Sequence, residues 1–402
     1  MKRYAILAGF LAAALALAFG AGLTVPEFGL ITSGAAADDG SFELSTRVSL
    51  ELGIEGGSKF AARFSLGFDS VSLEDYLAAI SRGAINPDGT DPDELAAAIR
   101  RLEASQGLYL KSAMVAFPGI FDTPVDLGVF VGGMDTLGGG RDFPRLYGSE
   151  AFATKLRGFL YYPQGIRGLP GRAYDGLHEV YGTGLRLSLP GERFTPYLYL
   201  YQDSFLGAGA YSADARVQYD GGPLKLEAFA GASGPEGAAG VYRAGLMFYF
   251  DTGSIGSFFA QAGIPRWDPS QAFEMSLFYF LFEPRFNFGA GELILTVFSH
   301  PGWYLQSRTY EEGFLELRAD LGFGSMESGG HGGLETVLEY KTKSSADPGP
   351  AIASPLAVSV APYYRALVSG VTVDLRLDVK LFPVPDRWYG FLAPALGISA
   401  SF

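Results

Sequence analysis

Apolar and polar residues alternate strictly over long stretches of this chain, and this pattern constrains the fold more than any other feature. Between Phe42 and Ile54, apolar or Thr residues occupy every second position, and mostly Glu, Ser and Arg residues lie between them. Successive side chains of a strand point to opposite faces, so the pattern predicts a β-strand with one apolar face. The stretch exceeds the roughly five or six residues of a globular strand. It suits a tilted strand that crosses a bilayer, which needs about nine to eleven residues plus an overhang.

The same alternation recurs along the rest of the chain. From Val371 to Leu381, apolar residues at every second position oppose Thr, Asp, Arg and Lys residues. Short runs such as PGER, DGG, DTGS and VSG, which are typical of tight turns, separate the alternating stretches. From residue 178 onward, strands are expected near 178–189, 195–203, 211–220, 223–232, 240–250, 254–264, 272–283, 290–300, 313–323, 333–343, 355–367, 370–382 and 387–402.

The N-terminal half is less regular. Strands are expected at 59–71, 108–117 and 125–133, and residues 23–34 are compatible with a first strand or with a lead-in. Residues 72–106 predict two short helices, because capping residues are followed by acidic residues in the first turn.

Residues 134–177 interrupt the pattern a second time. They are mostly irregular and contain many Gly, Pro, Arg and Tyr residues, and 154–162 can be read as a strand or as a loop. The pattern leaves open whether this segment, or the helical insertion at 72–106, covers the mouth of a barrel or fills its lumen.

The first residues predict export. Met1, Lys2 and Arg3 form a positive start, and a continuous apolar run rich in Ala and Leu follows as far as Gly22. A basic start, an apolar run and small residues at its end are typical of a secretory signal peptide. We therefore expect a signal peptide at 1–22 and a single domain at 23–402. An uncleaved anchor helix is the alternative, because the apolar run is long enough to span a membrane.

Composition excludes several classes of protein. The chain has no cysteine, which excludes a disulfide scaffold and an acylated lipoprotein. The formal net charge of −13 argues against nucleic acid as a partner. Charged residues make up 18% of the chain, below the roughly one quarter of a soluble protein. A half-apolar, half-polar strand repeated many times would give such a composition.

The predicted apolar face points toward lipid. The opposite face of the predicted strands carries charges of both signs, more than a dry core could hold. Aromatic residues also gather near the expected strand ends, as in the interfacial girdles of membrane barrels. The aromatic residues assigned to such a girdle are Tyr161, Tyr162, Tyr197, Tyr199, Tyr201, Phe248, Tyr249, Phe250, Trp303, Tyr304, Tyr363, Tyr364, Trp388 and Tyr389. The predicted fold class is all-β: a transmembrane antiparallel β-barrel of about 14–18 strands, with a short helical loop insertion near 72–106.

The last strand adds a resemblance to a known class. Leu392, Leu396, Ile398 and the terminal Phe402 share one face, although Pro394 on that face cannot donate a ladder hydrogen bond. Together with the signal segment, this strand resembles the closing strand of bacterial outer-membrane β-barrels. The resemblance implies an outer-membrane location, contact with outer-membrane lipid, and recognition of Phe402 by the barrel assembly machinery. It also implies that the short turns face the periplasm and the long loops face outward.

The leading functional hypothesis is a channel for passive transport of small solutes, lined by the polar strand faces. The candidate lumen-lining residues are Glu43, Arg47, Glu51, Asp214, Arg216, Arg318, Asp374, Arg376 and Lys380. A constriction is expected where 134–177 folds inward, because its arginines would face acidic residues across the lumen. The candidate constriction residues are Arg141, Arg145, Arg157, Arg167 and Arg172.

Other functions remain open at this stage. A transporter of fatty-acid type would have a more apolar lumen, and a surface adhesin or structural barrel would have a closed one. A barrel-embedded hydrolase would need Ser, His and acidic residues together at one rim. His178, His300 and His331 lack metal-ligand spacing, and Ser299 and His300 would point to opposite strand faces. We therefore expect no enzyme activity, metal or cofactor, and leave homo-oligomer formation open.

Overall fold

The computed structural model describes residues 22–36, 42–56, 61–70, 106–138, 178–206, 209–234, 240–301, 313–325, 329–342, 355–385 and 388–400. The first nine strands are β1 (Gly22–Ala36), β2 (Phe42–Gly56), β3 (Ala61–Ser70), β4 (Gln106–Phe117), β5 (Asp126–Leu137), β6 (His178–Ser188), β7 (Phe194–Asp203), β8 (Tyr211–Asp220) and β9 (Leu224–Gly234). The other nine are β10 (Val241–Asp251), β11 (Gly256–Trp267), β12 (Tyr279–Phe288), β13 (Gly291–His300), β14 (Gly313–Ser325), β15 (Gly330–Thr342), β16 (Leu356–Val368), β17 (Val371–Phe382) and β18 (Leu392–Ala400).

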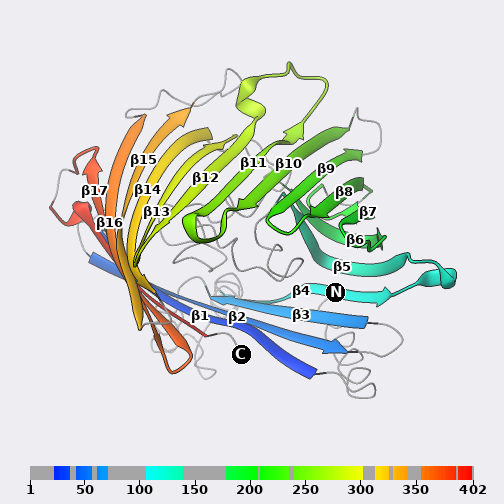
Figure 1. The fold of residues 1–402 in the computed structure, drawn as a ribbon, viewed down its shortest axis with the longest axis horizontal. Coiled ribbons are helices and arrows are strands. Elements are labelled where there is room, and N and C mark those ends of the chain that lie inside the picture. Colours follow the sequence, from blue (N-terminus) through cyan, green and yellow to red (C-terminus); the bar gives the residue numbers. More distant parts are fainter. Residues whose placement is uncertain are drawn as a thin grey trace, which may run out of the picture.

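These described strands form one closed antiparallel sheet of 18 strands. Every strand pairs with the next along the chain, and β18 pairs with both β17 and β1, which closes the ring. Figure 1 shows the strands following one another in sequence order, from blue β1 to the red C-terminal strands. The predicted all-β antiparallel barrel of about 14–18 strands is therefore confirmed, and 23–34 belongs to the first strand.

The two ends of the barrel differ in the length of their connections. At one end, short segments such as 189–193, 221–223, 252–255 and 369–370 join the strands, and this end is called the short-turn rim. At the other, the long-loop rim, lie connections such as 71–105, 138–177, 301–312 and 343–355. Because strands run alternately up and down, the start of β1 and the end of β18 both lie at the short-turn rim. This is the arrangement that the turn sequences predict.

The turn between β16 and β17 shows how the sequence builds this rim. Val368 pairs directly with Val371, which leaves Ser369 and Gly370 as a two-residue loop. Both loop residues have positive φ, 54° for Ser369 and 82° for Gly370. Two consecutive positive φ values are the signature of the turn whose twist matches that of the flanking strands. A glycine at the second position permits this backbone without steric cost.

The side chains of each described strand divide between the two faces of the sheet. Along β10, buried and exposed residues alternate without interruption from Val241 to Phe250. The exposed side is apolar and includes Leu246 at 63% exposure, whereas Arg243 and Met247 on the other side are almost fully buried. A soluble protein buries its large apolar residues, so this inversion indicates a surface made for lipid. The described residues contain no helix long and apolar enough to cross a membrane.

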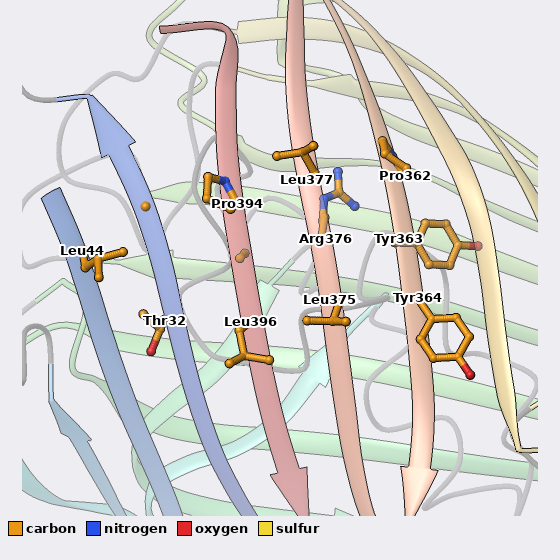
Figure 2. A pocket seen from close by; sticks show the side chains of 12 residues that line it. Thr32, Leu44, Pro362, Tyr363, Tyr364, Leu375, Arg376, Leu377, Pro394 and Leu396 are labelled. Carbon is orange, nitrogen blue, oxygen red and sulfur yellow. The ribbon is translucent and has the colours of Figure 1, made fainter. Parts of the chain in front are cut away.

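The seam between β1 and β18 shows the same division. Cross-strand neighbours Thr32 and Leu396 lie on the outer face, where Leu375 adjoins Leu396 from β17. Figure 2 shows these side chains along the outer groove, which has a volume of about 550 Å³. The hydroxyl groups of Thr32 and Thr46 lie 3.0 Å apart, so one donates a hydrogen bond to the other on an apolar surface.

Pro394 has a clear place at this seam. It pairs with Leu377 of β17, whereas the pairing of β18 with β1 extends only as far as Ala395. The ladder to β1 therefore ends at the residue next to this proline, which has no N–H to donate.

Some sequence predictions need correction or lie elsewhere. The strand expected at 272–283 begins only at Tyr279, because a 3-10 turn at Met275–Leu277 precedes it, and it continues to Phe288. The strand expected at 387–402 begins at Leu392, after a 3-10 turn at Trp388–Phe391. The signal segment up to residue 21, the predicted helices within 72–105 and the run 154–162 lie outside the described residues.

The register at the seam can be tested with a disulfide. Thr32→Cys and Leu396→Cys would place two thiols on directly opposed residues, about 5 Å apart between Cβ atoms, in a chain without other cysteines. We expect rapid cross-linking on oxidation, measured by counting free thiols. Thr32→Cys with Leu375→Cys is the matched control, because these residues lie two strands apart and should stay reduced. Equal cross-linking of both pairs would contradict the register.

Candidate functional site: the inner wall

The inward-facing side chains of β5 to β17 form the inner wall, which carries many charged and hydrogen-bonded groups beside buried apolar ones. Among the sequence-predicted residues, Asp214, Arg216, Arg318, Asp374 and Arg376 lie on this wall. Their side chains are largely buried, and each forms an ion pair with an oppositely charged side chain of the wall.

The other candidate residues have different positions. Lys380 lies near the end of β17 and is exposed. Glu43, Arg47 and Glu51 belong to β2, and their side chains are outside the description. The candidate constriction arginines, which are Arg141, Arg145, Arg157, Arg167 and Arg172, and the terminal Phe402 also lie outside the described residues.

The part of the wall nearer the long-loop rim contains the Asp214 network, which consists of His178, Tyr201, Asp203, Ser212, Asp214, Ser233 and Arg243. Its centre is a two-point ion pair, in which Nε and Nη2 of Arg243 each donate to one carboxylate oxygen of Asp214 at 2.7 Å. The hydroxyl of Tyr201 also donates to Asp214. Both groups are almost fully buried, so the two charges depend on each other.

This network brings Ser, His and acidic residues together at one rim, but not in a nucleophilic arrangement. Nε2 of His178 lies 2.9 Å from the hydroxyl of Tyr201, and its Nδ1 has no partner among the described residues. The Ser212 hydroxyl donates to Asp203 and lies 2.5 Å from that of Ser233. An activated serine needs a base within hydrogen-bond reach, which neither serine has in His178. The described residues also hold no group of three His, Cys, Asp or Glu side chains able to bind a metal.

A second group, the Arg216 cluster, lies nearer the short-turn rim. Nη2 of Arg216 donates to Glu227 over 2.6 Å, and Gln218 donates to the same carboxylate oxygen. The Tyr199 hydroxyl donates to Asp135, which lies 3.6 Å from Nη1 of Arg186. The members come from β5 to β9, so the closed sheet, rather than a local motif, assembles the cluster.

Gly138 shows that the chain turns into the barrel after β5. Its N–H donates to Glu227 of β9 over 2.7 Å, and its carbonyl oxygen accepts a hydrogen bond from Gln261 of β11. These strands are not neighbours of β5 in the sheet, so Gly138 has left the wall and lies against the inner face of another arc. Gln261 is itself oriented by the Tyr279 hydroxyl, 3.0 Å away.

The remaining arc of the wall, from β12 to β17, continues the charge pairing. Arg318 contacts Glu316 on its own strand and Glu335 on β15. Glu335 also accepts from Arg376 of β17, two strands away, over 2.6 Å. Bridges across two strands are possible on the concave side of a barrel, where inward side chains converge. The more accessible charges of this arc are Arg365, Glu292 and Asp378, at 21–29% side-chain exposure.

The inner wall also has an apolar band, which sequence reasoning did not anticipate. Tyr279, Phe298 and Phe314 from three successive strands are buried, with ring centroids 5.4 and 5.6 Å apart. Tyr199 and Tyr201, expected in the interfacial girdle, are instead buried on the inner wall. Alternation along β7 could have shown that both tyrosines face inward, because Leu198 and Leu200, on either side of Tyr199, are exposed on the outer face. The aromatic type of Tyr199 and Tyr201 alone led to the wrong prediction that they lie at the membrane interface.

Among known proteins, the chain shows similarity to solved structures. No family model matches the chain, and no curated protein matches it in sequence. A triple mutant of the Rhodopseudomonas blastica porin is 10% identical, with a TM-score of 0.44 over 95% of this chain and 100% of that one. A further mutant of the same porin is 10% identical with a TM-score of 0.46 over the same shares.

The Asp214 network yields a stability prediction. Arg243→Leu would leave the buried Asp214 carboxylate without its cation, which typically costs about 3–5 kcal/mol. We expect this loss in the free energy of unfolding, measured by urea titration of the barrel refolded in lipid vesicles. Lys380→Met, which removes an exposed cation from β17, should change that free energy by less than about 0.5 kcal/mol. Similar losses for both variants would contradict the role of the network.

Proposed function

We propose that this chain, a porin-like β-barrel of the bacterial outer membrane, is a channel for the passive passage of small polar solutes. The observation that carries the proposal is the closed 18-strand ring with charged side chains inside and apolar side chains outside. Lipid requires the apolar exterior, and a polar interior is the kind of wall that a water-filled channel needs.

Charge pairing on the wall supports a polar path. Arginines and carboxylates neutralise one another along the strands, so the wall offers hydrogen-bonding groups without a large field of one sign. The lumen-lining role of Glu43, Arg47, Glu51, Asp214, Arg216, Arg318, Asp374, Arg376 and Lys380 is part of this proposal.

The constriction is also a proposal. Gly138, at the start of the segment proposed to narrow the lumen, is held by Glu227 and Gln261 inside the barrel. Residues 134–137 belong to β5, so this position supports an inward course for the rest of 134–177 and a constriction role for Arg141, Arg145, Arg157, Arg167 and Arg172.

Export and assembly complete the proposal. Residues 1–22 would direct secretion, the short-turn rim would face the periplasm, and the assembly machinery would recognise Phe402. Outer-membrane lipid would surround the apolar exterior.

The proposal is tested by conductance in a planar lipid bilayer. We expect the refolded mature protein to give discrete, stable steps of ion current, because water and ions would follow the polar wall. The cation or anion preference of these steps tests whether the acidic surplus of the chain, with 43 acidic and 30 basic residues, lines the lumen. A correctly folded barrel that never conducts would refute the channel and favour a closed adhesin or structural barrel.

The anchoring of Gly138 leads to a second expectation. Gln261→Ala removes the side chain that donates to the Gly138 carbonyl and should increase single-channel conductance, because the chain start inside the lumen loses one of its two hydrogen-bond partners. Gln218→Ala is the matched control. Gln218 donates to Glu227, which is the other partner of Gly138, but it does not contact Gly138 itself. An unchanged conductance for Gln261→Ala would argue against an inward constriction held at this point.

The apolar band supports one alternative, a transporter of hydrophobic substrates. Tyr279, Phe298 and Phe314 could contact an acyl chain within the barrel. Liposome assays separate the two functions: a channel admits sugars in swelling experiments, whereas a hydrophobic transporter takes up a fluorescent fatty acid and excludes sugars. Replacement of Phe298 by Ala should weaken fatty-acid uptake in the second case and leave sugar entry intact in the first.

A further inference from the structure

A tyrosine lies between two arginines on the inner wall near the short-turn rim. Tyr197 of β7 is directly paired with Arg216 of β8, and Arg186 of β6 projects from the same wall. The Cζ atoms of Arg186 and Arg216 lie 5.7 and 5.6 Å from the centre of the Tyr197 ring. An aromatic ring attracts each guanidinium group, so it holds two like charges near each other that would otherwise repel.

Both arginines keep hydrogen-bond donors without acceptors. Nε and Nη1 of Arg216 and Nε of Arg186 are buried and have no hydrogen-bond partner in the described part of the chain. Arg216 is only 1% exposed, and its Nη2 donates to Glu227. A buried charged donor without an acceptor costs more than an ordinary unmade hydrogen bond. Such surplus donors indicate a place where an acceptor from outside the chain would be stabilised.

The neighbouring carboxylates do not accept hydrogen bonds from these N–H groups of Arg186 and Arg216. Glu227 already accepts hydrogen bonds from Arg216, Gln218 and the Gly138 N–H. Asp135 accepts from Tyr199 and lies 3.6 Å from Arg186, beyond hydrogen-bond distance. The cluster therefore has a balance of charge but an excess of donors over acceptors.

We propose that Arg186, Tyr197 and Arg216 form a binding site for the carboxylate group of a small organic acid. A carboxylate offers two oxygens and about four acceptor positions, which suits several N–H donors from two guanidinium groups. The site rests on the proposed channel function and gives it a substrate class: small carboxylates that pause at this wall on their way through.

The position of the site fits a solute in transit. Arg186 is 19% exposed and Tyr197 is half-buried, so the site is open on one side while Arg216 forms its buried floor. Arg186 and Tyr197 lie next to the short turn that joins β6 and β7. The Tyr197 hydroxyl has no hydrogen bond with a described residue and is available as a further donor.

The direct test is calorimetric titration of the full refolded mature barrel in detergent, with benzoate as the probe and neutral benzyl alcohol as its matched analogue. We expect binding of benzoate and none of benzyl alcohol. Arg186→Met and Arg216→Lys, which remove surplus donors, should each weaken benzoate binding about tenfold, since hydrogen bonds to charged groups are worth about that factor.

Two arginines elsewhere on the wall serve as controls. Arg285→Met matches Arg186→Met because Arg285 is 15% exposed and donates to Glu283. Arg243→Lys matches Arg216→Lys because both side chains are 1% exposed and donate to a carboxylate of the wall. Both should leave benzoate affinity within about twofold of the unchanged chain. Equal weakening by all four variants, or wild-type binding of both probes alike, would overturn the site.

A bilayer recording separates this inference from the channel itself. If potassium chloride gives current steps and benzoate shortens them in wild type but less in Arg186→Met, both proposals stand. If chloride conducts and benzoate has no effect in either assay, the carboxylate site is refuted and the channel remains. If nothing conducts but calorimetry shows the expected pattern, the channel is refuted and the site remains.

Discussion

The structure depends on backbone hydrogen bonds that have no free edge. In lipid, an unpaired N–H or carbonyl group has no water to bond, so a sheet can cross a membrane only if it closes on itself. The pairing of β18 with β1 meets this requirement, and the closed ring determines which side chains face lipid and which face the interior. Once the ring is closed, each alternating strand must point one set of side chains to lipid and the other to the interior, where the charged groups meet.

The interior resolves its charges by pairing along the wall. Arg243 with Asp214, and Arg318 with Glu316 and Glu335, are buried pairs that would be costly if either partner were missing. Such pairs fix side-chain positions on the wall and leave few donors unused. The cluster around Tyr197 is therefore informative, because three buried donors without a described partner gather there, whereas Nδ1 of His178 is the one such atom in its network.

The sequence was sufficient for the local geometry and insufficient for the interior. Alternation and turn residues predicted most strands, the two unequal rims and the outward apolar face, because all three are period-two or nearest-neighbour properties. Contacts such as Gly138 with Gln261 could not be predicted, since they join residues that only the curvature of the closed ring brings together. Tyr199 and Tyr201 show the same limit: residue type suggested an interface, but strand parity places them inside. The start of β12 was missed because an aromatic, alternating run at 272–278 forms a turn instead.

The seam has a consequence for how the barrel is made. β1 is 15 residues long and β18 only 9, and Pro394 ends their shared ladder, so the ring is joined by one of its shorter contacts. The two partners are also the first and last strands of the ring to be synthesised. A chain that has not reached β18 therefore presents two unsatisfied edges, and the circle can form only after β18 has been made. If this barrel has a line along which it could part to admit another strand, the boundary between β1 and β18 is a candidate, because a short ladder joins the two strands there.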